Sequence, residues 1–365
     1  MVYLLLAAGL VLLVFGAEFL VKGGAKLASI LGISPLVIGL TIVAFGTSAP
    51  ELVVSLRAAF QGQSDIALGN VVGSNIFNVL FILGLSALLT HLAVSAQLVR
   101  LDVPIMIFVS GWLWWICRDG VLSRMDGAGL FLGLVIYTTF LIFEGKKISP
   151  QSNNPAAEQD SLREKNVLSF KTIAFQILWV SLGLGLLVVG ADWLLQSAVA
   201  IARSWGVSEV IIGLTIVAGG TSLPEVATSV LASLRGQKDI AVGNVVGSNI
   251  FNILGILGLT GILSPAPIQV MDSFKYFDFP IMITVALACL PIFFTGKKIV
   301  RWEGAMFLVY YLIYTSYLIL HSLEHDILHS YQLVILWFIG PLTFVTIAVI
   351  VFQEIIQQRK DRSCY

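Results

Sequence analysis

Long apolar runs alternate with short polar breaks along most of the 365-residue chain. A run of about 20 apolar residues is long enough to cross a hydrocarbon core of about 30 Å as a helix. The pattern therefore predicts an all-α membrane protein whose spanning helices are joined by short connections. Eleven such runs lie at residues 2–21, 35–60, 65–90, 101–118, 126–143, 172–200, 209–234, 239–263, 279–295, 303–321 and 331–353.

One longer polar stretch interrupts this pattern between residues 144 and 171. It contains Ser-Asn-Asn-Pro and a run of mixed charge, and it is too short to form a domain of its own. We interpret it as a cytoplasmic linker between two halves of five helices each. The predicted organisation is a first half at 1–143, the linker at 144–171, a second half at 172–321, and an extra transmembrane helix with a cytoplasmic tail at 322–365.

The polar residues inside the apolar runs occur twice, 174 positions apart. Gly-Thr-Ser-Ala-Pro-Glu at Gly46–Glu51 returns as Gly-Thr-Ser-Leu-Pro-Glu at Gly220–Glu225, and the ten residues Gly69–Asn78 return unchanged at Gly243–Asn252. Because five helices separate the copies, the second copy enters the membrane from the opposite side. A ten-helix core of two inverted repeats is typical of secondary transporters, which bind their substrate between the repeats near the bilayer midplane.

Composition supports the membrane assignment. The chain is 58% hydrophobic and only 12% charged, with a mean hydropathy of +0.94, which is far from the balance of soluble domains. The net charge is zero, and we expect no nucleic-acid partner. An alternating topology with the N-terminus outside puts 16 Lys and Arg residues inside and 5 outside, so we expect a cell (inner) membrane protein with a cytoplasmic C-terminus.

The repeated motifs supply the candidate functional groups. Pro50 and Pro224 break their helices in mid-span, and broken backbone inside a membrane is tolerated only where it is buried in protein or lines a cavity. Two carboxylates at symmetric intramembrane positions are costly and indicate a functional site rather than protonated structural glutamates. The candidate ligands are Thr47, Ser48, Glu51, Ser74 and Asn78 in the first copy and Thr221, Ser222, Glu225, Ser248 and Asn252 in the second.

These candidate ligands are all oxygen donors. Calcium takes six to eight such oxygens at about 2.3–2.6 Å, whereas zinc or copper would favour His or Cys, which neither motif contains. We therefore expect transported cations at the site and no cofactor. The glycines of the motifs are explained equally well by close helix packing, and Asn70 and Asn244 are interpreted as structural rather than ligating.

The paired motifs resemble the alpha-repeats of the sodium/calcium exchangers in the cation/calcium antiporter superfamily, over roughly residues 1–320. The resemblance implies a ten-helix core in which Glu51 and Glu225 bind both calcium and sodium. It also implies that the hydroxyl and amide groups above, with the backbone carbonyls of Ala44 and Ala218, are supporting ligands. Potassium-dependent relatives carry aspartate where this chain has Asn252, so the resemblance does not extend to potassium co-transport.

Four functions compete at this point. A channel would be equally hydrophobic, but inverted repeats with broken helices fit alternating access better. The leading hypothesis is an antiporter that exchanges sodium for calcium by alternating access and exports calcium electrogenically. The alternative is a calcium/proton exchanger that uses the same glutamates. An intramembrane enzyme would need a nucleophile with a base, or paired aspartates in mid-span, and neither is found. The expected partners are calcium ions, sodium ions and the lipid bilayer, and the sequence identifies no protein partner.

Two polar groups outside the motifs receive structural interpretations. Glu18 matches Asp192 in the second half, and for this pair an interfacial ion pair, such as Glu18 with Lys22, is favoured over a role in an ion vestibule. The spacing of His321, His325 and His329 is interpreted as a wet interfacial loop rather than a metal site.

Overall fold

The computed structural model describes residues 2–147, 170–207, 212, 216, 218–323 and 340. Within these residues, eight helices are long and apolar enough to cross a membrane, and one bent pair of helices adds a ninth candidate. The protein is therefore mostly helical, as the sequence predicts. The predicted helix at 331–353 apart from residue 340, His325, His329 and most of the linker lie outside the described residues, so the full count of ten helices plus one stays a prediction.

The first half contains five candidate spans, of which the second is broken. Its helices are α1 (Val2–Leu31), α2 (Pro35–Ile38), η1 (Gly39–Val43), α3 (Ala44–Thr47), α4 (Ala49–Phe60), α5 (Ser64–Phe77), η2 (Asn78–Leu83), α6 (Gly84–Leu89), η3 (Leu98–Asp102), α7 (Val103–Ile116), η4 (Cys117–Asp119) and α8 (Arg124–Lys147). η1, η2 and η3 are π-helical turns that continue into the α-helix that follows.

The second half contains the same kinds of element. Its described helices are α10 (Phe170–Ser204), α12 (Ala218–Gly220), α13 (Leu223–Leu234), α14 (Lys238–Phe251), η6 (Asn252–Leu257), α15 (Gly258–Leu263), η7 (Phe274–Asp278), α16 (Phe279–Phe294), η8 (Thr295–Lys297) and α17 (Arg301–Ser322). The elements α4, α5, η2 and α6 begin and end 174 positions before α13, α14, η6 and α15. Beyond them the offset grows, because α16 begins 176 positions after α7 and α17 begins 177 after α8.

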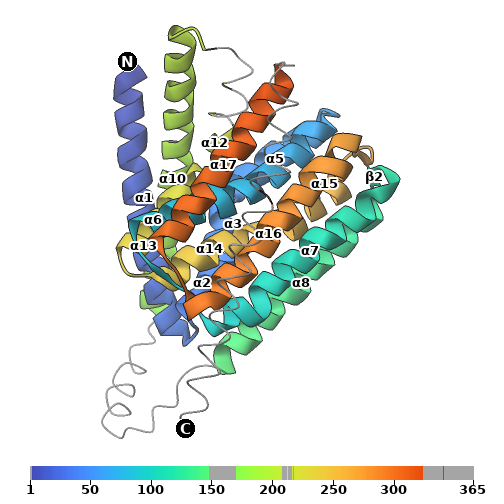
Figure 1. Ribbon diagram of the computed structural model, residues 1–365. Coiled ribbons are helices and arrows are strands. Elements are labelled where there is room, and N and C mark those ends of the chain that lie inside the picture. Colours follow the sequence, from blue (N-terminus) through green and yellow to red (C-terminus); the bar gives the residue numbers. More distant parts are fainter. Residues whose placement is uncertain are drawn as a thin grey trace, which may run out of the picture.

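The two halves are interlocked rather than laid side by side. α1 and α10 run alongside each other at one side of the molecule (Figure 1). The last helix of each half packs on the other half, α8 on η6 and α15, and α17 on η2 and α6. The spans α5–α6 and α14–α15 are the most buried of the candidate spans, so the second repeated motif lies at the centre of the bundle.

Two short antiparallel strand pairs also join the halves. β1 (Leu92–Ala93) pairs with β4 (Lys298–Ile299), and β2 (Val121–Leu122) pairs with β3 (Ile268–Gln269). Each strand lies in a connection between spans. The pairs therefore tie connections of one half to connections of the other.

Candidate cation site

Both copies of the Gly-Thr-Ser-x-Pro-Glu motif lie at a helix break. The helix pair on either side of Ser48 is bent by 45°, and Ser48 itself leaves helical geometry with φ −82° and ψ 8°. Ser222 has nearly the same angles, φ −86° and ψ 10°. Pro50 and Pro224 lie in the first two positions of the helix that follows, where a missing N–H costs little. The predicted break is present, and the prolines begin new helices rather than kink continuous ones.

Glu51 and Glu225 lie in the first turns of the new helices, α4 and α13. Both side chains are buried, with exposed fractions of 0% and 1%. A helix N-terminus carries partial positive charge, so this position favours a carboxylate. The breaks therefore place both acids in the protein interior with the positive ends of two helices beside them.

Each glutamate accepts a hydrogen bond from the serine of the opposite half. Ser222 Oγ donates to Glu51 Oε1 at 2.9 Å, and Ser48 Oγ donates to Glu225 Oε1 at 2.8 Å. A serine just before a helix usually caps that helix with its side chain, but neither serine does so here. Because the hydroxyls are directed across the interface, the two halves form one site rather than two separate ones.

The second oxygen of each carboxylate has no such partner. Glu51 Oε2 and Glu225 Oε2 are buried, and neither accepts a hydrogen bond from any residue that the structure describes. An unpaired buried carboxylate oxygen is costly. These two oxygens can accept a cation.

Two amide oxygens also lack a hydrogen-bond partner among the described residues. Asn78 and Asn252 are the first residues of the π-helical turns η2 and η6. Asn78 Nδ2 donates to Asn249 Oδ1 at 3.0 Å, and Asn252 Nδ2 donates to Asn75 Oδ1 at 3.0 Å. These bonds fix the orientation of the two amides. Their oxygens, Asn78 Oδ1 and Asn252 Oδ1, are buried and have no donor among the described residues.

Asn75 and Asn249 hold these amides in place. Asn75 Nδ2 donates to the backbone oxygen of Asn249 at 3.2 Å, and Asn249 Nδ2 donates to that of Asn75 at 3.3 Å. The sequence does not single these two residues out as candidate ligands. Their presence in both motifs was the available signal, but the bonds join residues 174 positions apart.

Of the remaining side-chain candidates, Thr47, Ser74 and Ser248 are buried and Thr221 is partly buried. Thr47 Oγ1 donates to Asn244 Oδ1 at 3.1 Å, and Ser222 Oγ also contacts Ser74 Oγ at 3.2 Å. The backbone oxygen of Ala44 accepts the amide of Ser48 at 3.1 Å and also accepts from Thr47 Oγ1 at 3.4 Å. The structure places Thr221 after α12, Ser248 as a buried residue of α14, and Ala218 as the first residue of α12.

Asn70 and Asn244 have the hydrogen bonds of structural residues. Asn70 Nδ2 donates to Ser55 Oγ at 2.8 Å and to the backbone oxygen of Glu51 at 3.0 Å. Asn244 Nδ2 donates to Ser229 Oγ at 2.9 Å. These bonds fasten the central helices to α4 and α13, in agreement with the structural interpretation.

Two glycines of the second motif allow the central helix to approach the broken one. A Cβ at Gly247 would lie 2.7 Å from Leu40 Cα and 2.9 Å from Ala44 Cβ, and one at Gly243 would lie 3.0 Å from the backbone oxygen of Leu36. Any side chain here would push α14 away from α2, η1 and α3. The glycines thus set the distance across which the polar contacts form.

Comparison with known proteins identifies the family. The family model described as sodium/calcium exchanger protein matches residues 1–143 and 175–320. The chain belongs to the sodium/calcium exchanger family. The sodium/calcium exchanger MaX1 of Methanosarcina acetivorans is 36% identical over 344 residues, which cover 86% of this chain and 97% of that one. The inner membrane protein YrbG of Escherichia coli is 36% identical over 286 residues, covering 78% and 87%.

The fold also matches that of a solved exchanger. The sodium-calcium exchanger NCX_Mj superimposes with a TM-score of 0.73 and is 30% identical, with 86% of this chain and 98% of that chain covered. The protein is thus an antiporter of the prokaryotic sodium/calcium exchanger type, an integral membrane transporter of cations rather than an enzyme. Its expected substrates as a family member are sodium and calcium ions.

Proposed function

We propose that the protein exchanges sodium for calcium at one shared site between its two halves, and that it exports calcium electrogenically. The observation that carries this proposal is the pair of buried carboxylates, each with one oxygen bonded to the opposite half and one oxygen unpartnered among the described residues. Asn78 Oδ1 and Asn252 Oδ1 add two more unpartnered oxygens. With hydroxyl and carbonyl oxygens nearby, this set fits calcium's preference for six to eight oxygen ligands.

The charge of the site supports a divalent substrate. Glu51 and Glu225 contribute two negative charges when ionised, and the other candidate ligands are neutral. Two buried like charges repel each other and lose their hydration, so a stable arrangement needs a counter-ion. One calcium ion neutralises the pair, and sodium ions entering in its place would compensate the same charges.

The contacts between halves support the inverted topology. In the alternating arrangement predicted above, β1 and β4 both lie inside, whereas β2 and β3 both lie outside. Arg124 Nη2, on the predicted outer side, donates to the backbone oxygen of Ser264 on the same side at 3.1 Å. Because every one of these contacts joins connections assigned to one side, the two halves are consistent with an inverted pair, in which alternating access would expose the shared site to each side in turn.

A calcium/proton exchanger with the same glutamates is the second candidate. The unpartnered Oε2 atoms are equally able to hold protons, so the site geometry alone does not separate the two couplings. Calcium uptake driven by a sodium gradient or by a pH gradient separates them.

The deciding experiment is uptake of 45Ca²⁺ into proteoliposomes of the purified protein. We expect uptake when sodium is loaded inside and diluted outside, and no uptake from a pH gradient of equal driving force. A valinomycin clamp tests electrogenicity, because each net charge moved is worth about 2.3 kcal/mol per 100 mV. Uptake that follows the pH gradient and ignores sodium and voltage would establish the proton alternative.

A further inference from the structure

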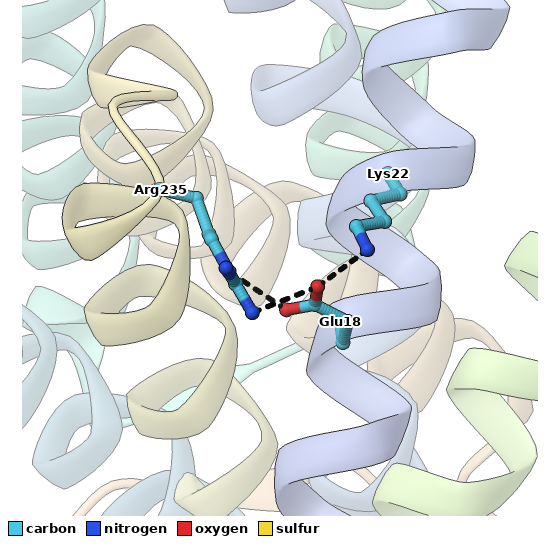
Figure 2. A network of polar contacts seen from close by, with 3 residues as sticks. All are labelled: Glu18, Lys22 and Arg235. Carbon is cyan, nitrogen blue, oxygen red and sulfur yellow. Dashed lines mark hydrogen bonds and ion pairs between the residues drawn. The ribbon is translucent and has the colours of Figure 1, made fainter.

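A polar pocket of about 430 Å³ lies between α1 and the end of α13, outside the cation site. Glu18 and Lys22 come from α1, and Arg235 follows α13 (Figure 2). Lys22 Nζ lies 2.7 Å from Glu18 Oε1, and Arg235 contacts both carboxylate oxygens, at 2.9 Å through Nη2 and 3.0 Å through Nε. The predicted pairing of Glu18 with Lys22 is present, and Arg235 is an additional partner.

The pocket carries an excess of positive charge. Glu18 is the one acidic residue among its lining residues, whereas Lys22, Lys26 and Arg235 are all basic. The Glu18 side chain is only 13% exposed, but those of Lys22 and Arg235 are 70% and 56% exposed. The buried carboxylate therefore fixes the positions of the Lys22 and Arg235 side chains. The solvent-exposed parts of these two side chains, together with Lys26, are accessible to an anion.

At the corresponding place in the second half, the acidic residue bonds to a neutral amide instead of to cations. Asp192 is the mate of Glu18, and it accepts two hydrogen bonds from Gln196 Nε2, at 2.9 and 2.8 Å. Gln196 stands where the first half has Lys22, and Gln61 ends α4 where Arg235 ends α13. Since a single neutral amide bonds to the acidic residue in the second half, the fold itself does not require cations in the first.

The position along α1 places the pocket at the membrane surface. The 20 residues from Val2 to Val21 span about 30 Å as a helix, which matches the hydrocarbon core. Lys22 and Lys26 follow directly, at the end that the proposed topology assigns to the cytoplasm. Basic pockets between helices on the cytoplasmic side are suited to anionic lipid headgroups, which are concentrated in that leaflet.

We propose that this pocket binds the phosphate of an anionic phospholipid headgroup through Lys22, Lys26 and Arg235. The proposal rests on the topology proposed above but not on which ions are exchanged. Because binding is measured without transport, its failure is distinct from failure of the exchange mechanism.

The test measures lipid binding to the full-length protein in neutral detergent by native mass spectrometry. Dioctanoyl phosphatidylglycerol is titrated against dioctanoyl phosphatidylcholine, which has the same chains but no net charge. We expect at least tenfold tighter binding of phosphatidylglycerol. Inorganic phosphate at matched concentration distinguishes a soluble ligand, and complete displacement of the lipid by it would overturn the lipid proposal.

Substitutions locate the binding site. The double variant Lys22→Gln with Arg235→Gln carries glutamine at both positions, as Gln196 and Gln61 do at the matching positions of the opposite half. We expect it to lose most of the preference for phosphatidylglycerol. Lys26→Gln leaves the contacts of Glu18 intact and should weaken the preference for phosphatidylglycerol several-fold. This single variant therefore tests the proposal even if the double variant does not fold. Arg100→Gln with Lys297→Gln removes two other predicted inner charges as a control. Retained preference in both pocket variants, or equal loss in the control, contradicts the proposal.

Discussion

The cation site and the ends of α1 and α10 show two different outcomes of one duplication. At the cation site, the serine–glutamate and asparagine–asparagine contacts recur with the halves exchanged, as in the paired bonds of Ser48 with Glu225 and of Ser222 with Glu51. The contacts of Thr47 with Asn244 and of Ser222 with Ser74 occur once, because Thr221 Oγ1 and Ser248 Oγ have no partner among the described residues. At the ends of α1 and α10, Glu18 pairs with Lys22 and Arg235, whereas Asp192 bonds, among the residues that the structure describes, to the neutral Gln196. The halves are similar where we propose that they share one ligand, and they differ at the ends of α1 and α10, which the proposed topology assigns to opposite sides of the membrane.

Loss of either glutamate tests this equivalence most severely. Glu51→Gln and Glu225→Gln should each abolish exchange, because each removes one of the two charges that neutralise the bound calcium ion. Loss of one partner of a buried ion pair costs about 3–5 kcal/mol, which corresponds to a loss of calcium affinity of more than about 100-fold. The measurement is sodium-driven 45Ca²⁺ flux in proteoliposomes, with detergent melting curves to confirm folding. Asp102→Asn, which changes a buried carboxylate outside the site, is the matched control and should retain flux. Substantial flux in one glutamate variant alone would show that the halves are not equivalent.

The serine contacts give a smaller effect that should be equal in both halves. Ser48→Ala and Ser222→Ala each remove a hydrogen bond to a carboxylate, which is worth about 1.5–3 kcal/mol. Part of this loss is recovered when the ion binds, so we expect up to about tenfold weaker apparent calcium affinity in each. Ser110→Ala removes a buried hydroxyl that bonds to Met106 in the same helix and should leave affinity unchanged. A weaker affinity in one of the two site variants, with none in the other, would show that the halves do not both contribute to the site.

Potassium dependence tests the neutrality of the amide positions. Asn78 and Asn252 add no charge to the site, so replacing external and internal potassium by choline should not change sodium-driven calcium flux. Asn252→Asp adds a third carboxylate and should make the flux depend on an additional cation, whereas Asn70→Asp, at the structural amide, should not produce that dependence. A strict potassium requirement in the unchanged protein would contradict the assigned charge of the site.

The smallest expected effect concerns Glu18 on α1 and its counterpart Asp192 on α10. Glu18→Gln removes two partly exposed ion pairs, each worth about 0–1 kcal/mol, so the melting temperature should fall by about 1–3 °C. Asp192→Asn keeps a hydrogen-bonding side chain beside Gln196 and should not shift it. Differential scanning fluorimetry in detergent compares the two, and equal shifts would show that Arg235 adds nothing to the first-half contact.

Much of this architecture can be predicted from the sequence because its polar motifs are long and doubled. The motifs identify Glu51, Glu225 and their neighbours, and proline predicts the helix breaks. The pairing of each serine with the opposite glutamate could not be predicted, since the partners are 171 and 177 positions apart. The π-helical turns at Asn78 and Asn252 also lack a sequence pattern, because they differ from an α-helix by one residue in hydrogen-bond spacing. Arg235 was missed as a partner of Glu18 for the same reason as the serines, because the two lie far apart in the chain.

The central claim is that two equivalent halves form one calcium site, and calcium-binding stoichiometry tests it most directly. Isothermal titration of the purified protein in sodium-free buffer should give one calcium per chain, and added sodium should displace it. Glu51→Gln and Glu225→Gln should each lose this binding completely, because each removes one of the two carboxylates of the same site. Two calcium ions per chain, with one retained in each variant, would show two independent sites and contradict the account.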